Sequence, residues 1–177
     1  MQINSINNFN VNSKYENNVS FSGRRKIIDF GENHISPRAI KLIKEMSSVV
    51  ETDWQIIRNS KNLMDTPKYY TGDKHGHLAT VRPIYQHLKK FILMEVDDGK
   101  YIDRVIIDRA RPNDYKYERA LITPHGSATL KSFDSTLERS FDIEHRVSNY
   151  IETYISKICN SESDKLTKHN LGIPRKD

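Results

Sequence analysis

Apolar and polar residues alternate between residues 87 and 133 in a way that predicts consecutive β-strands. The first apolar run is followed by Asp97-Asp98-Gly99-Lys100, and Asp-Gly between two apolar runs is the strongest short signal for a hairpin. Further turns are predicted at Arg111-Pro112-Asn113-Asp114 and Pro124-His125-Gly126, where Pro, Asn and Gly favour turn conformations. Connections this short require neighbouring strands to run antiparallel. The predicted meander has strands at residues 88–96, 101–109, 115–123 and 127–133.

Helical patterns lie on both sides of these strands. The first begins at Ser36-Pro37, because serine is a good N-cap and proline suits the first helical position. Its apolar residues recur at steps of three and four, and the helix is expected to reach about Asn62 or to break near Ser47-Ser48. The second is predicted to begin at a capping box, Ser135-Thr136-Leu137-Glu138, and to end near Asn160.

Shorter segments carry weaker patterns. Lys26–Phe30 is an expected edge strand, and Thr66–His77 is expected to be a loop because of its Pro and Gly residues. Residues Leu78–Arg82 are predicted to form a further strand. Pro83 is expected either to end this strand or to restrict it to a sheet edge. Residues 84–88 are expected to form a short helical turn or to lead directly into the next strand.

These elements predict an α+β fold. We expect a four- or five-stranded, mainly antiparallel meander sheet, with the two long amphipathic helices packed on one face, in a single domain from Gly23 to Cys159. The Asn/Ser-rich segment Met1–Ser22 is an expected disordered tail, and residues 160–177 are an expected flexible polar tail. The expected location is the cytoplasm. The alternative is export through a non-classical signal in the polar N-terminal segment.

Composition and charge narrow the function classes only slightly. Hydrophobic residues make up 36% of the chain and charged residues 29%, which is enough for one ordinary core. The single cysteine, Cys159, excludes an internal disulfide framework. No apolar run approaches the roughly 18 residues of a transmembrane helix, so no membrane span is predicted. The net charge of +5 is spread along the chain rather than gathered in one basic tract, so it adds little support for nucleic-acid binding.

The densest group of candidate catalytic residues is Asp73-x-His75-x-His77. Two histidines two residues apart point the same way in an extended chain, and a carboxylate precedes them at the same spacing. Two His and one carboxylate form the ligand set of open zinc and non-haem iron sites, so Asp73, His75 and His77 are candidate ligands for a divalent metal. With His125 added, the three histidines are candidates for proton transfer or phosphate binding.

Aromatic and basic side chains alternate in the third predicted strand. Tyr115 and Tyr117 share one face, Arg119 continues that face, and Lys116 lies between the tyrosines in the sequence. Strand aromatics that stack on bases, with neighbouring lysines that follow phosphates, are typical of single-stranded nucleic-acid binders. A purely structural role explains the same tyrosines without a ligand, because tyrosine is favoured in strands.

No P-loop, dinucleotide fingerprint, nucleophile elbow or zinc-binding helix motif is present in the sequence. The leading hypothesis is therefore a non-enzymatic protein-binding or adaptor module with a protein partner. One alternative is a small metal- or histidine-dependent hydrolase or phosphate-processing enzyme that uses the Asp73/His75/His77 loop. A second alternative is an RNA- or DNA-binding sheet that uses Tyr115, Tyr117 and their basic neighbours.

Overall fold

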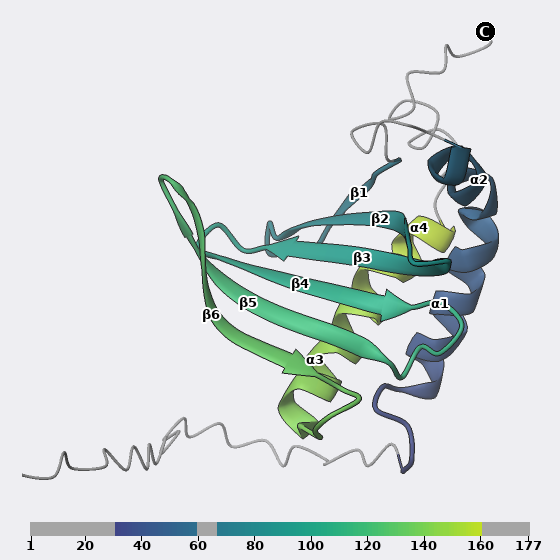
Figure 1. Ribbon diagram of the computed structural model, residues 1–177. Coiled ribbons are helices and arrows are strands. Elements are labelled where there is room, and N and C mark those ends of the chain that lie inside the picture. Colours follow the sequence, from purple (N-terminus) through teal and green to yellow (C-terminus); the bar gives the residue numbers. More distant parts are fainter. Residues whose placement is uncertain (1–30, 60–66, 161–177) are drawn as a thin grey trace, which may run out of the picture.

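The computed structural model describes residues 31–59 and 67–160 (Figure 1). The predicted strand at Lys26–Phe30 and the predicted tail at residues 1–22 lie outside the described residues, as does the predicted tail at residues 160–177 except for Asn160, which ends α4. The helical elements are α1 (Pro37–Val49), α2 (Glu51–Asn59), α3 (Phe141–Tyr150), the π-helical segment η2 (Ile151–Ile155) and α4 (Ser156–Asn160). The strands are β1 (Tyr69–Gly72), β2 (Leu78–Gln86), β3 (Lys89–Asp97), β4 (Tyr101–Asp108), β5 (Tyr115–Thr123) and β6 (Gly126–Asp134).

The sheet is an antiparallel meander in the order β1-β2-β3-β4-β5-β6. The predicted α+β class and antiparallel pairing are confirmed, but the sheet has six strands rather than four or five. The unexpected strand is β1, which lies inside the segment predicted to be a loop. Its four residues pair with Leu78–Val81 of β2. Pairing with β2, which begins soon afterwards at Leu78, therefore outweighs the local effect of the nearby Pro and Gly residues.

Strand β2 continues through Pro83 to Gln86 and does not end at the proline. Its pairing with β1 stops opposite Val81, so Pro83 lies on a stretch of β2 that pairs only with β3. This agrees with the rule that proline is tolerated where a strand has no second neighbour. His87 and Leu88 then form a tight turn with positive φ angles of 48° and 64°, so residues 84–88 lead directly into β3 without a helical turn.

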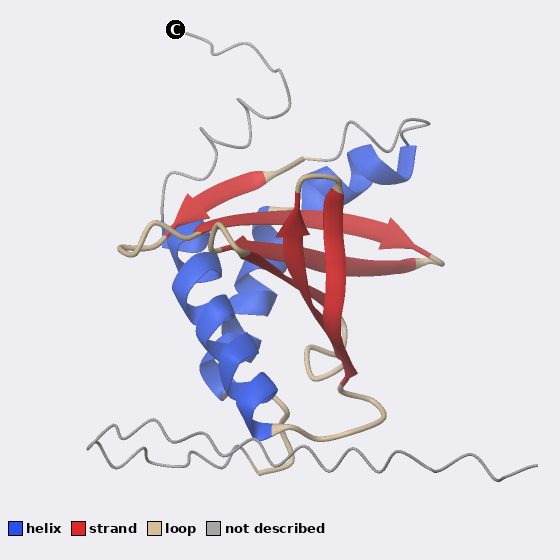
Figure 2. Cartoon of the chain, turned by 90° about the vertical axis from the view of Figure 1, so that its left-hand side faces the viewer, coloured by secondary structure: helices blue, strands red, loops and turns tan. Residues whose placement is uncertain are grey.

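All helices cover the same face of the sheet, called the inner face below (Figure 1). The sheet is strongly twisted, so that β5 and β6 run steeply across the direction of β2 and β3 (Figure 2). The hydrophobic core lies between this inner face and the helices. Its largest fully buried side chains are Trp54, Tyr69, Tyr115, Tyr154, Ile35, Ile43, Met46, Ile92, Met94, Ile107, Ile151 and Ile155.

The first predicted helix is divided in two, as the second of the two expectations allowed. α1 ends at Val49 and α2 begins at Glu51, with the fully buried Val50 between them. The Ser36 side chain accepts a hydrogen bond from the Ala39 N–H, which confirms the predicted N-cap. Trp54 of α2 is buried in the core, and the Lys90 ammonium of β3 lies 5.4 Å from the centre of its ring.

The predicted capping box at the start of the second helix is wrong. The Ser135 hydroxyl donates to the Asn113 carbonyl at 2.7 Å and accepts from the Tyr115 N–H at 2.8 Å, so it closes the end of β5 and β6. The helix begins six residues later, at Phe141. It ends at Asn160 as predicted, but its middle widens into the π-helical segment η2. No helix among the described residues is long and apolar enough to cross a membrane.

Candidate functional site

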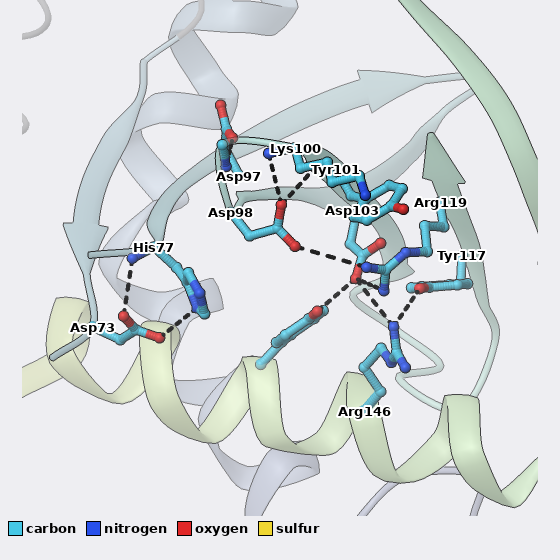
Figure 3. Close-up of polar contacts among 12 residues, drawn as sticks. Asp73, His77, Asp97, Asp98, Lys100, Tyr101, Asp103, Tyr117, Arg119 and Arg146 are labelled. Carbon is cyan, nitrogen blue, oxygen red and sulfur yellow. Dashed lines mark hydrogen bonds and ion pairs between the residues drawn. The ribbon is translucent and has the colours of Figure 1, made fainter. Parts of the chain in front are cut away.

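A polar network occupies one end of the otherwise apolar inner face (Figure 3). Along β4, buried Val105 and Ile107 face the helices, and the two-residue period of a strand places Asp103 on the same face. On β5, Tyr117 lies opposite Val105, and Arg119 lies opposite Asp103. The apolar face of the sheet therefore ends in an acidic and a basic side chain that are direct neighbours across two strands.

Asp103 is the centre of this network. Its side chain is only 4% exposed, and its Oδ2 atom accepts a hydrogen bond from the Tyr150 hydroxyl at 2.5 Å. The same oxygen lies 3.4 Å from a guanidinium nitrogen of Arg119 and 3.6 Å from one of Arg146. The other oxygen, Oδ1, is buried and has no hydrogen-bond partner among the described residues. One carboxylate thus joins β4, β5 and α3 through a single oxygen atom.

Further contacts extend the network from Asp103 to the β3–β4 turn. Arg119 lies 3.7 Å from the Asp98 carboxylate, and its guanidinium stacks 4.5 Å from the centre of the Tyr101 ring. Lys100 also lies over this ring, at 5.1 Å. The turn itself is rigid, because Asp98 Oδ1 accepts from the N–H groups of Lys100 and Tyr101 at 2.9 and 2.6 Å. These bonds hold two cations next to one aromatic ring.

Burial changes the acidity of the tyrosines in the network. Burial is the main cause of the raised pKa of Tyr150, and its hydrogen bond to Asp103 adds to the effect. Burial is also the largest cause of the raised pKa of Tyr117, and the nearby negative charge of Asp103 is the second cause. The Tyr117 hydroxyl also lies 3.4 Å from Arg146. Both tyrosines therefore remain neutral hydrogen-bonding groups at physiological pH.

A second carboxylate, Asp73, lies in the turn between β1 and β2. Its Oδ1 accepts from the N–H groups of His75 and His77 at 2.8 and 3.0 Å, a local pattern that organises the turn. Its Oδ2 lies 2.9 Å from His77 Nδ1 and accepts from the Tyr154 hydroxyl at 3.1 Å. A carboxylate bonded to Nδ1 orients the imidazole and leaves Nε2 for another partner.

These contacts determine the acidity of Asp73. Desolvation opposes its ionisation, but the two backbone N–H donors, the Tyr154 hydroxyl and the nearby His77 outweigh desolvation and lower the pKa of Asp73 to about 2. In turn, burial and the hydrogen bond to Asp73 raise the pKa of Tyr154 to about 12. Asp73 is therefore ionised at every physiological pH.

This lowered pKa predicts a pH-dependent contribution of Asp73 to stability. The contribution is present above the unfolded value of 3.8 and is lost as pH falls through about 2, because only the folded protein favours the ionised form. Asp73→Asn is therefore expected to lower the urea midpoint at pH 7, with the difference from the parent protein vanishing near pH 2. Urea unfolding between pH 7 and 2 measures this. A difference that stays constant over the whole range would contradict it.

The π-helical segment brings both carboxylates against one helix. Tyr150 and Tyr154 are four residues apart and bond Asp103 and Asp73, respectively. Four residues of an α-helix rotate by about 40° more than one full turn, whereas four residues of the wider π-helix rotate by less than one full turn. The four residues from Arg146 to Tyr150 are α-helical, and the next four, to Tyr154, lie in η2. The two rotations therefore deviate from a full turn in opposite directions. Three side chains spaced by four residues can then face the sheet together.

The structure brings together only part of the candidate histidine site. Asp73 contacts His77, and the ring centres of His75 and His77 are 6.1 Å apart. His75 is exposed, and His125 is exposed in the turn between β5 and β6. The described part of the chain records no contact between His125 and either of the other two histidines. Within residues 31–59 and 67–160, no group of three or more His, Cys, Asp or Glu side chains is arranged to hold a metal ion.

The candidate nucleic-acid residues point in two directions. Tyr115 and Tyr117 share one face as predicted, but they are 2% and 3% exposed and pack in the core. Their rings are therefore not available for stacking on bases in this structure. Lys116 faces the opposite side and lies 3.4 Å from Asp134, while Arg119 belongs to the Asp103 network.

Sequence patterns missed the central residues Asp103, Arg146 and Tyr150. A signal for Asp103 was present, because it occupies the same alternating phase as Val105 and Ile107, where an apolar residue is expected. A charged residue in the buried phase of a strand requires a partner. Tyr150 belongs to the apolar stripe of the second predicted helix, and a buried tyrosine hydroxyl usually has a hydrogen-bond partner. For Arg146 no such local signal exists, since arginine on a helix commonly faces solvent.

The outer face of the sheet carries the other notable feature, a groove of about 450 Å³. It lies beside β6 at its Asp134 end, and Leu137 on its rim is 84% exposed. Among residues 31–59 and 67–160, β6 pairs only with β5, so no described strand lies along its outer edge. The groove is lined by Arg104, Ile106, Lys116, Tyr117, Glu118, Ser132, Phe133, Asp134, Leu137 and Glu138.

The two edges of the sheet differ. At the other edge, β1 has only four residues, and Lys157 of α4 donates a hydrogen bond to the Gly72 carbonyl. β6 has nine residues, and all those from Gly126 to Ser132 are exposed. A register shift in the β5–β6 ladder leaves Leu130 without an opposite residue, which divides the edge into two parts. The second part, from Lys131 to Asp134, runs beside the groove.

Comparison with known proteins found no matching family model, no similar curated protein and no similar solved structure.

Proposed function

We propose that the chain is a non-enzymatic protein-binding module, in which β6 and the neighbouring groove receive an extended segment of a partner protein. The observation that carries the proposal is the groove on the outer face, where the apolar side chains of Ile106 and Leu137 lie near the edge of β6 that no other described strand covers. An unpaired edge offers backbone N–H and C=O groups to an added strand, and a neighbouring pocket selects its side chains.

The exposed leucine supports this assignment. Leu137 lines the groove, and its side chain is 84% exposed. Apolar contact residues in the centre of an interface provide most of its binding energy. The groove therefore suits one apolar side chain of the partner, held between Leu137 and the sheet. The charged side chains around it, among them Lys116, Glu118 and Asp134, suit the polar rim of such an interface.

A photo-reactive amino acid at Ser132, which lines the groove, tests the proposal in cells of the source organism. We expect a discrete crosslinked adduct, and we expect Leu137→Asp to reduce its yield by about tenfold or more, because a charge in the groove excludes an apolar side chain. Leu88→Asp is the matched control, since Leu88 is 87% exposed but lies in the β2–β3 turn. Equal yields from the parent protein and both variants would overturn the proposal.

A further inference from the structure

Cationic side chains from three elements gather at the polar end of the inner face. Arg119 on β5 lies directly opposite Lys131 on β6, and Arg146 reaches the same cluster from α3. Two like charges directly opposite each other in a sheet repel and destabilise the pairing. The described structure records no ion pair for Lys131, which is exposed. An anion placed between these cations would remove this repulsion.

The guanidinium groups in this cluster are incompletely paired. All the ion-pair distances of Arg119 and Arg146 lie between 3.4 and 3.7 Å. Arg104 on the outer face provides a comparison within the same protein, because it donates to Glu95 at 3.1 Å and to Glu118 at 2.9 Å. Strong charge-assisted bonds have lengths of about 2.7–2.9 Å. Arg104 is thus close to saturated, whereas the two inner arginines retain capacity for an oxyanion.

The buried Asp103 holds these arginines in place before any ligand arrives. Both contact its Oδ2, and the Tyr150 hydroxyl fixes that oxygen at 2.5 Å. The side chains of Arg119 and Arg146 are nevertheless 26% and 39% exposed, so both remain accessible from solvent. Groups that are ordered beforehand lose less conformational freedom on binding.

We propose that Arg119, Lys131 and Arg146 form a binding site for a phosphate monoester group. Together with Lys100 these side chains carry four positive charges, and the carboxylates Asp98 and Asp103 that pair with the arginines carry two negative ones, which leaves an excess of two positive charges. A phosphate monoester carries a charge of about −1.5 to −2 at neutral pH, which matches this excess better than a single carboxylate does. Planar guanidinium groups also bind phosphate oxygens in pairs. The site lies on the inner face and does not depend on the partner docking proposed for the outer groove.

Titration of the full chain followed by NMR of the arginine Nε–Hε groups tests the site directly. With inorganic phosphate at constant ionic strength, we expect saturable shifts at Arg119 and Arg146 and none at Arg104. The double variant Arg119→Gln/Arg146→Gln is expected to weaken binding by about tenfold or more, as the loss of charge-assisted bonds predicts. Arg104→Gln is the matched control and should leave the affinity unchanged.

Lys131→Gln keeps the proposal testable if the double variant fails to fold, because Lys131 is exposed and its replacement leaves the Asp103 contacts intact. It is expected to weaken phosphate binding severalfold. A second titration with O-phosphoserine shows whether the site prefers a phosphorylated side chain or free phosphate. Tighter binding than inorganic phosphate assigns a phosphorylated side chain, and weaker binding assigns free phosphate. Absence of saturable shifts with both ligands, or equal shifts at Arg104, would overturn the proposal.

Discussion

Replacing Ile107 by alanine is expected to destabilise the protein by about 2–5 kcal/mol, the usual range for removing most of a buried isoleucine side chain. Ile107 is fully buried in the inner face of β4, where it belongs to the core between the sheet and the helices. The packed side chains around it are held by strands and helices, so they can only partly fill the cavity that alanine leaves. Urea unfolding of both proteins measures the difference.

Ile106→Ala is the matched control for this prediction. Ile106 is the preceding residue of the same strand, but it faces the outer groove and is only partly buried. Its replacement is expected to cost about 1 kcal/mol, because the helices do not cover that face. Comparable losses for the two variants would mean that the outer face is also packed in solution, contrary to the one-sided arrangement of the helices.

Replacing Arg139 by methionine is expected to destabilise the protein by about 3 kcal/mol, the lower end of the range for breaking a buried ion pair. Arg139 donates to the two carboxylate oxygens of Glu144 at 2.6 and 3.2 Å. Glu144 is 1% exposed, so without the guanidinium it would be an uncompensated buried charge. The lower end applies because Arg139 is 42% exposed and water screens part of the attraction. Chemical denaturation at pH 7 gives the value.

A second substitution separates the lost charge pairing from lost packing. In the Arg139→Met background, Glu144→Gln removes the unpaired charge but keeps nearly the same shape, so it should restore most of the stability. The four proteins of this double-mutant cycle give the coupling energy between the two side chains. If Glu144→Gln brings no recovery, the destabilisation arises from the packing of the Arg139 side chain and not from the buried carboxylate.

Short-range patterns predicted the elements whose geometry depends on local chemistry. The Asp97-Asp98-Gly99 turn formed as expected, with Gly99 at a φ of 86° and the Asp98 side chain bonded to the following N–H groups. The Ser36 cap likewise depends only on residues within one helical turn. The same reasoning failed for Ser135, because its hydroxyl found partners in Asn113 and Tyr115, which are more than a helical turn away.

The amino-acid sequence by itself determined the α+β class, the antiparallel order of the central strands and the apolar stripes of the helices. These follow from turn chemistry and from periods of two and about 3.6 residues, which act over short distances along the chain. Only the tertiary structure decided the strand β1 and the network around Asp103, which joins Arg119 and Arg146 from different elements. The sequence specifies the charge of each residue, but the packing of the twisted sheet against its helices determines which charged side chains come into contact.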